Sequence, residues 1–240
     1  MPARNIDTYW RDGCPQVEGW LAVELLDHLK CVARAQDDAK LTGNIAEIGV
    51  FRGKLLIALA HLARPGERCV AIDIFDDQAK NIDGSGAGSL ALLQANFQRH
   101  APDGAELITV KADSLAITID QRVAIARDHG PFRLFSVDGG HTVQHALNDL
   151  LMAQDMLADG GVVLLDDVFH RHWPGVTEAV GLFYSKYVPR IAPFLHAYNK
   201  LFLTSYTCHA HFLRYAVEVF RARPHFKAVR MFGSDVVAFS

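Results

Sequence analysis

The sequence predicts an α/β fold, in which helices cover both faces of a mostly parallel sheet. Two observations carry this prediction. From residue 43 onward, short apolar runs alternate with longer segments whose apolar residues recur at helical spacing, and a polar or glycine-rich turn follows each apolar run. Strands that alternate with helices in this way are typical of βαβ units and therefore of a parallel sheet. The 240 residues are enough for one such domain with a sizeable core.

Five apolar runs mark the first strands, and a helical pattern follows each of them. The runs are NIAEIG, RCVAIDIF, LITVKADS, FRLFSVDGG and GVVLLDD, and the helical patterns cover residues 54–63, 89–100, 119–129, 143–157 and 176–187. A sixth strand is expected at KLFLTS, before a helix at 209–222. Two β-rich runs, FKAVRMF and VVAFS, flank a turn that contains Gly233 and predict a terminal hairpin. The expected fold is a Rossmann-like, doubly wound, mostly parallel sheet of seven strands with a C-terminal antiparallel hairpin.

The N-terminal part of the chain shows a different pattern. Between residues 19 and 40, apolar residues recur at helical spacing in a segment without proline. This pattern predicts one amphipathic helix that covers an edge of the sheet. We therefore divide the chain into an N-terminal helical extension, residues 1–42, and one larger domain, residues 43–240.

Composition narrows the class of partner. Lysine and arginine number 24 against 27 aspartate and glutamate, for a formal charge of −3, and no basic run stands out, so a nucleic-acid partner is not expected. No apolar stretch is long enough to span a bilayer, and the N-terminus lacks a signal-peptide pattern. The four cysteines are scattered without metal-type spacing, as expected of reduced thiols. We expect a cytoplasmic protein without membrane contact, for which a homo-oligomer is compatible with the sequence.

A glycine-containing loop, Glu47-Ile48-Gly49-Val50-Phe51-Arg52-Gly53, follows the first predicted strand. Glycines at such a turn let the backbone approach a ligand, and the following helix offers free N–H groups. Asp73 ends the next strand, where a carboxylate can accept hydrogen bonds from ribose hydroxyls. The loop lacks the middle glycine of G-x-G-x-x-G, and Glu47 would repel a pyrophosphate but attract a cationic group. The expected ligand is a nucleoside without phosphates, with Asp113 and Ser114 near its base.

Three aspartates fall at the ends of neighbouring predicted strands: Asp138 after FRLFSV, and Asp166 with Asp167 after GVVLL. Because ligands bind at the carboxyl ends of strands in an open α/β sheet, these side chains should converge there. Three carboxylates suit a hard divalent cation such as Mg²⁺, Ca²⁺ or Mn²⁺, and without a cation their clustering would be unfavourable. His141 follows closely and should face the same acceptor. Capping of the following helices by Asp138 and Asp166 is the alternative interpretation.

From the glycine loop to the terminal hairpin, the chain resembles the class I S-adenosylmethionine-dependent methyltransferases. The hairpin is expected to match the reversed last strand of that fold. The resemblance implies a set of cofactor contacts: Glu47, Gly49 and Gly53 beside the methionine, Asp73 at the ribose, and Asp113 or Ser114 at the adenine. S-adenosylmethionine is therefore the expected cofactor.

The D-x-x-H stretch and the later acidic pair resemble the metal-dependent sugar O-methyltransferases of antibiotic biosynthesis. This resemblance implies that Asp138, Asp166 and Asp167 bind Mg²⁺ or another hard divalent cation, and that His141 is the general base, acting beside Asp138 at the catalytic centre. The expected activity is methyl transfer to a hydroxyl of a small-molecule partner, a sugar or a glycosylated natural product. Two alternatives stay open: an enzyme related to cephalosporin hydroxylases, and a non-catalytic nucleoside-binding module.

The loop from Asp76 to Ser89, DDQAKNIDGSGAGS, is polar and rich in glycine, and it comes soon after Asp73. It is therefore placed to close over cofactor and acceptor. Lids on such sites exclude water from the reaction. A flexible connection without a lid function is the alternative.

Overall fold

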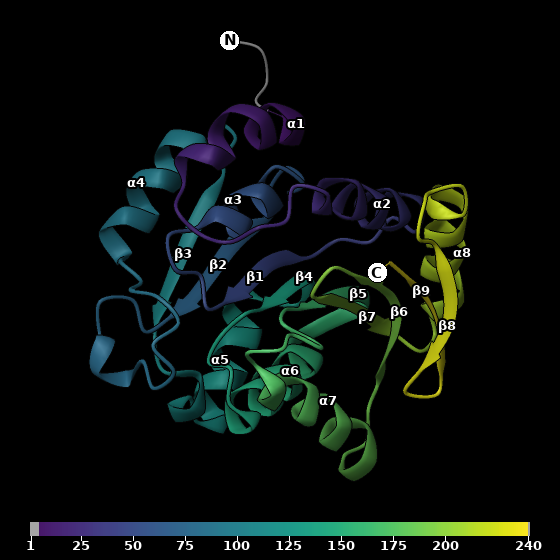
Figure 1. Cartoon of the computed structure of the whole chain (residues 1–240). Helices are drawn as coiled ribbons and strands as arrows, with labels where there is room; N and C mark the ends of the chain where they lie inside the picture. Colours follow the sequence, from purple (N-terminus) through teal and green to yellow (C-terminus); the bar gives the residue numbers. More distant parts are fainter. Residues whose placement is uncertain (1–4, 240) are drawn as a thin grey trace.

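Strands from most of the chain form one sheet, whose order is β3-β2-β1-β4-β5-β7-β6-β9-β8 (Figure 1). The computed structural model describes residues 5–239. Its strands are β1 (Asn44–Ile48), β2 (Arg68–Asp73), β3 (Glu106–Lys111), β4 (Phe132–Val137), β5 (Leu157–Leu165), β6 (Ile191–Ala197), β7 (Lys200–Ser205), β8 (Lys227–Met231) and β9 (Ser234–Ala238). Strands β1 to β5 run parallel, whereas β7 runs antiparallel to both β5 and β6. The predicted Rossmann-like α/β fold with a mostly parallel sheet is confirmed.

Helices cover both faces of this sheet (Figure 1). They are α1 (Ile6–Thr8), α2 (Leu25–Asp38), α3 (Lys54–Ala60), α4 (Leu90–His100), α5 (Ile119–His129), α6 (Val143–Met156), α7 (Pro174–Lys186) and α8 (His209–Phe220). Buried side chains of α2, α3 and α8 belong to one hydrophobic core, and those of α6 and α7 belong to a second core. Among the described residues, no helix combines the length and the apolar character needed to cross a membrane.

The far end of the sheet differs in detail from the prediction. The described residues form nine strands instead of seven, because residues 191–197 form β6 and the terminal hairpin, β8 with β9, joins the sheet beside β6. Two strands run against the others: β7 is antiparallel to β5 and β6, and β8 of the terminal hairpin is antiparallel to β9. Pro193 conceals β6 in the sequence, since proline rarely occupies a central strand. An irregular register between Pro193 and Leu195 accommodates it here.

The amphipathic helix of the N-terminal extension is shorter than predicted. Helix α2 begins at Leu25, and residues 17–24 form an irregular segment instead of its first turns. Gly19 has a φ of 141°, which is incompatible with a helix. The ring of Trp20 lies 5.4 Å from that of Phe51, so this segment reaches the glycine loop.

A buried ion pair joins several elements on the amino-terminal side of β4. Arg133 is 1% exposed, and its guanidinium donates to the Glu67 carboxylate at 2.8 to 2.9 Å. The same group donates to Gln36 Oε1 and to the Leu62 carbonyl, each at 2.6 Å. Because every partner is buried or half-buried, the pair links α2, the end of α3 and β4 in one network.

We predict that Arg133→Met lowers the free energy of unfolding by about 3 to 5 kcal/mol, because it leaves the Glu67 carboxylate buried without its cation. Denaturant unfolding followed by circular dichroism measures this loss. Arg127→Met is the matched control, since its ion pair with Asp128 is exposed and exposed ion pairs contribute little to stability. Equal losses in the two variants would contradict a stabilising role for the buried network.

Candidate active site

The candidate site lies where the carboxyl ends of β1, β2, β4 and β5 meet. The register pairs Ile48 with Ile72 and with Val137, and it pairs Val137 with Leu165. The segments that follow these strands therefore emerge at one edge of the sheet, as expected for a ligand site in an open α/β fold. Two cavities open along this edge.

Gly49 lets the end of β1 approach the loop after β4. Its φ is 79°, and a Cβ atom built on it would lie 1.8 Å from the carbonyl oxygen of Asp138. No other residue fits this approach without moving the backbone. The Asp138 N–H donates to the Ile48 carbonyl at 2.9 Å. The glycine loop and the first acidic residue are thus held against each other.

Asp73 holds the glycine loop through hydrogen bonds to its backbone. Its carboxylate accepts hydrogen bonds from the N–H groups of Val50 at 2.6 Å, Phe51 at 3.0 Å and Phe75 at 2.5 Å. Burial raises the pKa of Asp73, and the three N–H groups act against this shift. Asp73 therefore has a second role beyond the predicted ribose contact, because it also holds Phe51 in its left-handed backbone conformation.

The first cavity contains most of the predicted cofactor residues. Its lining includes Gly49, Asp73, Asp113 and Ser114. Gly53 does not line it: this residue precedes α3 with a φ of 90°, and its Cα packs against the Leu93 side chain. The first cavity therefore brings four of the predicted cofactor residues together, and Gly53 lies outside its lining; the cofactor contacts stay predictions.

The second cavity adjoins the first and has a volume of about 640 Å³. The two cavities share five lining residues: Gly49, Phe51, Ser85, Gly86 and Asp138. The irregular N-terminal segment closes one side, where the Lys54 ammonium donates to the Gly19 carbonyl at 2.9 Å. The second cavity is large enough for an acceptor molecule next to the cofactor.

Glu47 lies in the wall of the second cavity. It is 2% exposed, and its Oε2 atom has no hydrogen-bond partner among the described residues. Burial raises the pKa of Glu47 to about 8, with Lys200 acting in the opposite direction. A buried carboxylate oxygen without a partner favours a cationic ligand group, such as the ammonium of a methionine moiety. The predicted position of Glu47 beside that moiety fits this environment.

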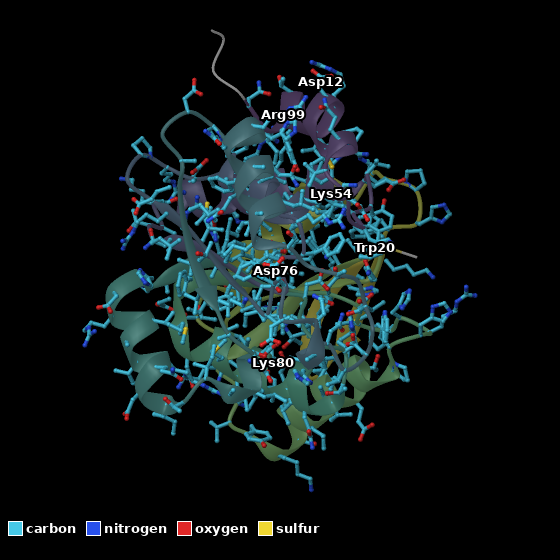
Figure 2. The ribbon with its side chains drawn as sticks, turned by 90° about the vertical axis from the view of Figure 1, so that its left-hand side faces the viewer. Asp12, Trp20, Lys54, Asp76, Lys80 and Arg99 are labelled. Atoms are coloured by element: carbon cyan, nitrogen blue, oxygen red, sulfur yellow. The ribbon has the colours of Figure 1, made fainter. Side chains whose placement is uncertain are left out.

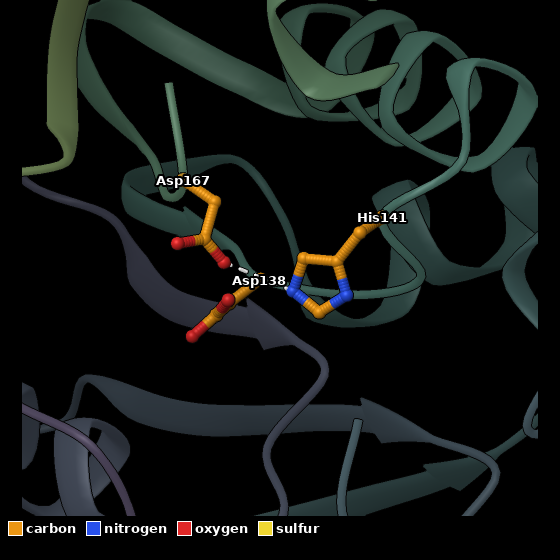
Figure 3. A group of neighbouring side chains, drawn as sticks. All are labelled: Asp138, His141 and Asp167. Carbon is orange, nitrogen blue, oxygen red and sulfur yellow. Dashed lines mark ion pairs between the residues drawn. The ribbon is translucent and has the colours of Figure 1, made fainter. Parts of the chain in front are cut away.

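Asp138, His141 and Asp167 form a compact group at the junction of the two cavities (Figure 3). One ligand atom from each lies within 4.8 Å of those of the others, which is close enough to hold one metal ion. Burial, followed by the charge of Asp166, raises the pKa of Asp138 well above its usual range. Carboxylate oxygens and an imidazole suit a divalent cation, whose charge would relieve this repulsion.

His141 is oriented by contacts on both ring nitrogens and on its face. Its Nδ1 lies 2.9 Å from Asp83 Oδ2, and its Nε2 lies 3.0 Å from Asp167 Oδ2. The ring stacks on Trp173 at a centroid distance of 4.2 Å. Burial lowers the pKa of His141, but the carboxylates of Asp167 and Asp83 outweigh burial and raise it. With Nδ1 facing Asp83, Nε2 is the nitrogen directed at the acidic group.

The two adjacent aspartates after β5 have different partners. Asp167 faces His141 and accepts a hydrogen bond from the Asn199 side chain at 3.0 Å. Asp166 is buried in an ion pair with Lys200 and is not in the compact group of possible metal ligands. The assignment of Asp166 as a metal ligand thus stays a prediction, and the structure adds a competing partner for it.

The loop from Asp76 to Ser89 borders both cavities. Figure 2 views the molecule from the side of this loop and labels Asp76 and Lys80 on it. The Asp83 carboxylate accepts the backbone N–H of His141 at 2.7 Å as well as contacting its ring. These contacts hold the loop against the candidate catalytic residue, as a lid would require; the lid function stays a prediction.

Three residues of the site escaped sequence reasoning: Asp83, Trp173 and Lys200. Asp83 and Trp173 lie in irregular segments, so no periodic pattern places them. Lys200 carries a weak signal, because it opens the otherwise apolar run KLFLTS. A charged residue at the start of a buried strand indicates a partner at that edge of the sheet.

A family model described as a methyltransferase domain matches residues 46–168, about half of the chain. The match begins in β1 and ends just beyond the two aspartates that follow β5. A search of curated proteins returned no match.

Solved structures share the fold at low sequence identity. The O-methyltransferase NovP is 15% identical with a TM-score of 0.58, over 77% of this chain and 80% of that chain. An O-methyltransferase from Bacillus cereus in complex with SAH is 16% identical with a TM-score of 0.54, over 82% and 88%. MycE, from the mycinamycin biosynthetic pathway, in complex with Mg and SAH, is 19% identical with a TM-score of 0.54, over 83% and 53%.

We predict that Asp73→Ala weakens binding of S-adenosylhomocysteine by more than about tenfold, since loss of a buried carboxylate acceptor typically costs on the order of 2 to 3 kcal/mol. Titration calorimetry measures the dissociation constant. Asp103→Ala serves as control, because Asp103 is exposed in the turn between α4 and β3. A dissociation constant within threefold of the wild-type value would contradict the assigned role of Asp73.

Proposed function

The chain belongs to the methyltransferase domain family, and from this premise we propose that it transfers a methyl group from S-adenosylmethionine to a hydroxyl group of a small molecule. One observation carries the proposal: a cavity lined by Gly49, Asp73 and Asp113 adjoins a larger cavity, and Asp138 lines both. The methyl donor and the acceptor can therefore meet beside the acidic group. A protein that only binds a nucleoside would need neither the second cavity nor its carboxylates.

The acceptor that we propose is polyhydroxylated, a sugar or a glycosylated natural product. The second cavity presents carboxylates, an amide at Asn199 and the imidazole of His170, together with the aromatic rings of Trp20 and Trp173. Carboxylates and amides bind several hydroxyl groups at once, and aromatic rings pack against apolar faces. The O-methyltransferase NovP and the methyltransferase MycE of the mycinamycin biosynthetic pathway share the fold.

A divalent cation fits between the carboxylates of Asp138 and Asp167, which form a compact group with His141 and offer hard oxygen ligands. Such a cation would make a bound hydroxyl more acidic. The MycE structure contains Mg together with SAH, which supports the same combination here. Asp138 and Asp167 are the carboxylates that we expect to hold the cation and to orient the acceptor beside the methyl donor.

Side chains of the protein position the acceptor and remove its proton. Methyl transfer is an in-line displacement in which the cofactor supplies the activated group, so the protein must position the acceptor and remove its proton. We propose His141 as the proton acceptor at Nε2. Asp83 at Nδ1 holds the ring in the tautomer that leaves Nε2 basic, and Trp173 fixes the ring plane. The loop from Asp76 to Ser89 excludes water from the site.

We predict that chelation of divalent cations abolishes methyl transfer and that added Mg²⁺ or Mn²⁺ restores it. Asp167→Asn should lower the rate by at least about 100-fold without rescue by the cation, because the amide lacks the charge that a hard cation requires. Release of S-adenosylhomocysteine over a panel of hydroxylated sugars and glycosides measures the rate. Asp155→Asn, on the exposed side of α6, is the matched control, and a chelator-resistant wild-type rate would refute the cation.

For His141→Ala we predict a loss of about 10²- to 10⁴-fold in the rate of methyl transfer, the usual contribution of a general base. Binding of S-adenosylhomocysteine should stay within threefold of wild type, because His141 does not line the first cavity. His172→Ala, which alters an exposed histidine nearby, should retain the wild-type rate. A His141→Ala rate within threefold of wild type would exclude His141 as the base.

A further inference from the structure

The direction of β7 determines which residues reach the two aspartates after β5. Because β7 runs antiparallel to β5, its first residues lie beside the last residues of β5, and the register pairs Leu201 with Leu165. The residues just before Leu201 therefore face the residues just after Leu165. Asn199 donates to Asp167 at 3.0 Å, and Lys200 forms an ion pair with Asp166. Each aspartate receives its own partner from the β6–β7 turn.

The ion pair of Lys200 with Asp166 is almost completely removed from water. The side chains are 5% and 8% exposed. An unpaired ammonium at such a position would be strongly unfavourable, so the lysine is stable there only with a carboxylate partner. Burial lowers the pKa of Lys200, but the charge of Asp166, followed by those of Asp138 and Glu47, outweighs burial and raises it. Lys200 therefore stays an ammonium at neutral pH.

The two aspartates after β5 have different stabilising partners. Lys200 forms an ion pair with Asp166. It also lies close enough to Glu47 and Asp138 for its charge to lower the pKa of each. Asp167, in contrast, is stabilised by His141 and Asn199. The Asp138 carboxyl is in hydrogen-bond contact with that of Asp166 and, among the described hydrogen bonds, has no cationic side-chain partner.

We propose that Lys200 is a positioning residue that acts as a resident cation: it keeps Asp166 out of the metal site, so that the divalent cation is held by Asp138 and Asp167 beside His141. This inference rests on the cation of the proposed function and changes its ligand set, since the sequence predicts Asp166 as a ligand. With few protein ligands, the cation keeps positions for the acceptor hydroxyls. Metal binding and acceptor binding are then mutually dependent, as is common for Mg²⁺ sites.

Mn²⁺ binding, followed through the electron paramagnetic resonance signal of the free ion, tests the ligand set without any assay of activity. Asp166→Asn should bind Mn²⁺ within threefold of wild type, whereas Asp167→Asn should bind it at least about tenfold more weakly. Lys200→Met should bind Mn²⁺ at least about tenfold more tightly, because Asp166 becomes free to join the site. Lys200→Met/Asp166→Asn should return to within threefold of wild type.

Thermal unfolding supplies the second measurement. Lys200→Met should have a lower Tm than wild type without metal, because its buried carboxylates lose their cation, and Mn²⁺ should raise that Tm more than it raises the wild-type Tm. Lys200→Arg should resemble wild type in both measurements. If Lys200→Met does not fold even with Mn²⁺, Lys200→Met/Asp166→Asn, which leaves neither charge of the buried pair without a partner, still decides whether Asp166 is a ligand.

The outcomes separate this inference from the proposed function. A loss of Mn²⁺ affinity in Asp166→Asn as large as that in Asp167→Asn would overturn the role of Lys200 while leaving a metal-dependent methyltransferase intact. An unchanged or weaker affinity in folded Lys200→Met would also overturn it. If the wild type binds no Mn²⁺, the cation of the proposed function fails, and binding gained by Lys200→Met alone still supports the resident cation.

Discussion

The carboxyl edge of the parallel sheet imposes one constraint on the whole site: buried carboxylates gather there, and each needs a partner. Asp73 is satisfied by three backbone N–H groups, Asp166 by Lys200, and Asp167 by His141 with Asn199. Glu47 retains an oxygen without a partner. A buried charge is stable only when an opposite charge or hydrogen bonds compensate it. A positively charged ligand group at this edge would therefore stabilise the ionised form of Glu47.

The proposed cofactor and the proposed cation are both positively charged, so both suit the buried carboxylates at this edge. The sulfonium cofactor carries a cationic methionine end, which suits the environment of Glu47, and a divalent cation suits Asp138 with Asp167. In this proposal the two positively charged ligands occupy adjoining cavities that share Asp138 in their lining. Their charge would stabilise the ionised forms of Glu47 and Asp138, so ligand binding should stabilise the fold as well as enable the chemistry.

Two segments outside the sheet cover this edge: the irregular segment before α2 and the loop from Asp76 to Ser89. The irregular segment before α2 brings Trp20 to Phe51, and a Cβ atom built on Gly86, in the loop from Asp76 to Ser89, would lie 3.2 Å from the Phe51 ring and 3.3 Å from the Trp20 ring. Asp83 joins the same loop to His141. The covering segments therefore touch both the cofactor cavity and the candidate base, which ties closure over the ligands to the orientation of the imidazole.

Local pattern alone determined the α/β class, five of the parallel strands and the residues at their carboxyl ends, because strand and helix periodicity and the topology of parallel sheets are set over short stretches of chain. It also placed Asp73 and the three aspartates Asp138, Asp166 and Asp167 at one edge. Only the tertiary structure decided which side chains partner which. The antiparallel course of β7 delivers Lys200 to Asp166, the loop delivers Asp83 to His141, and Pro193 hides a strand that depends on its neighbours for its register. These are contacts between residues distant in sequence, and no local periodicity encodes them.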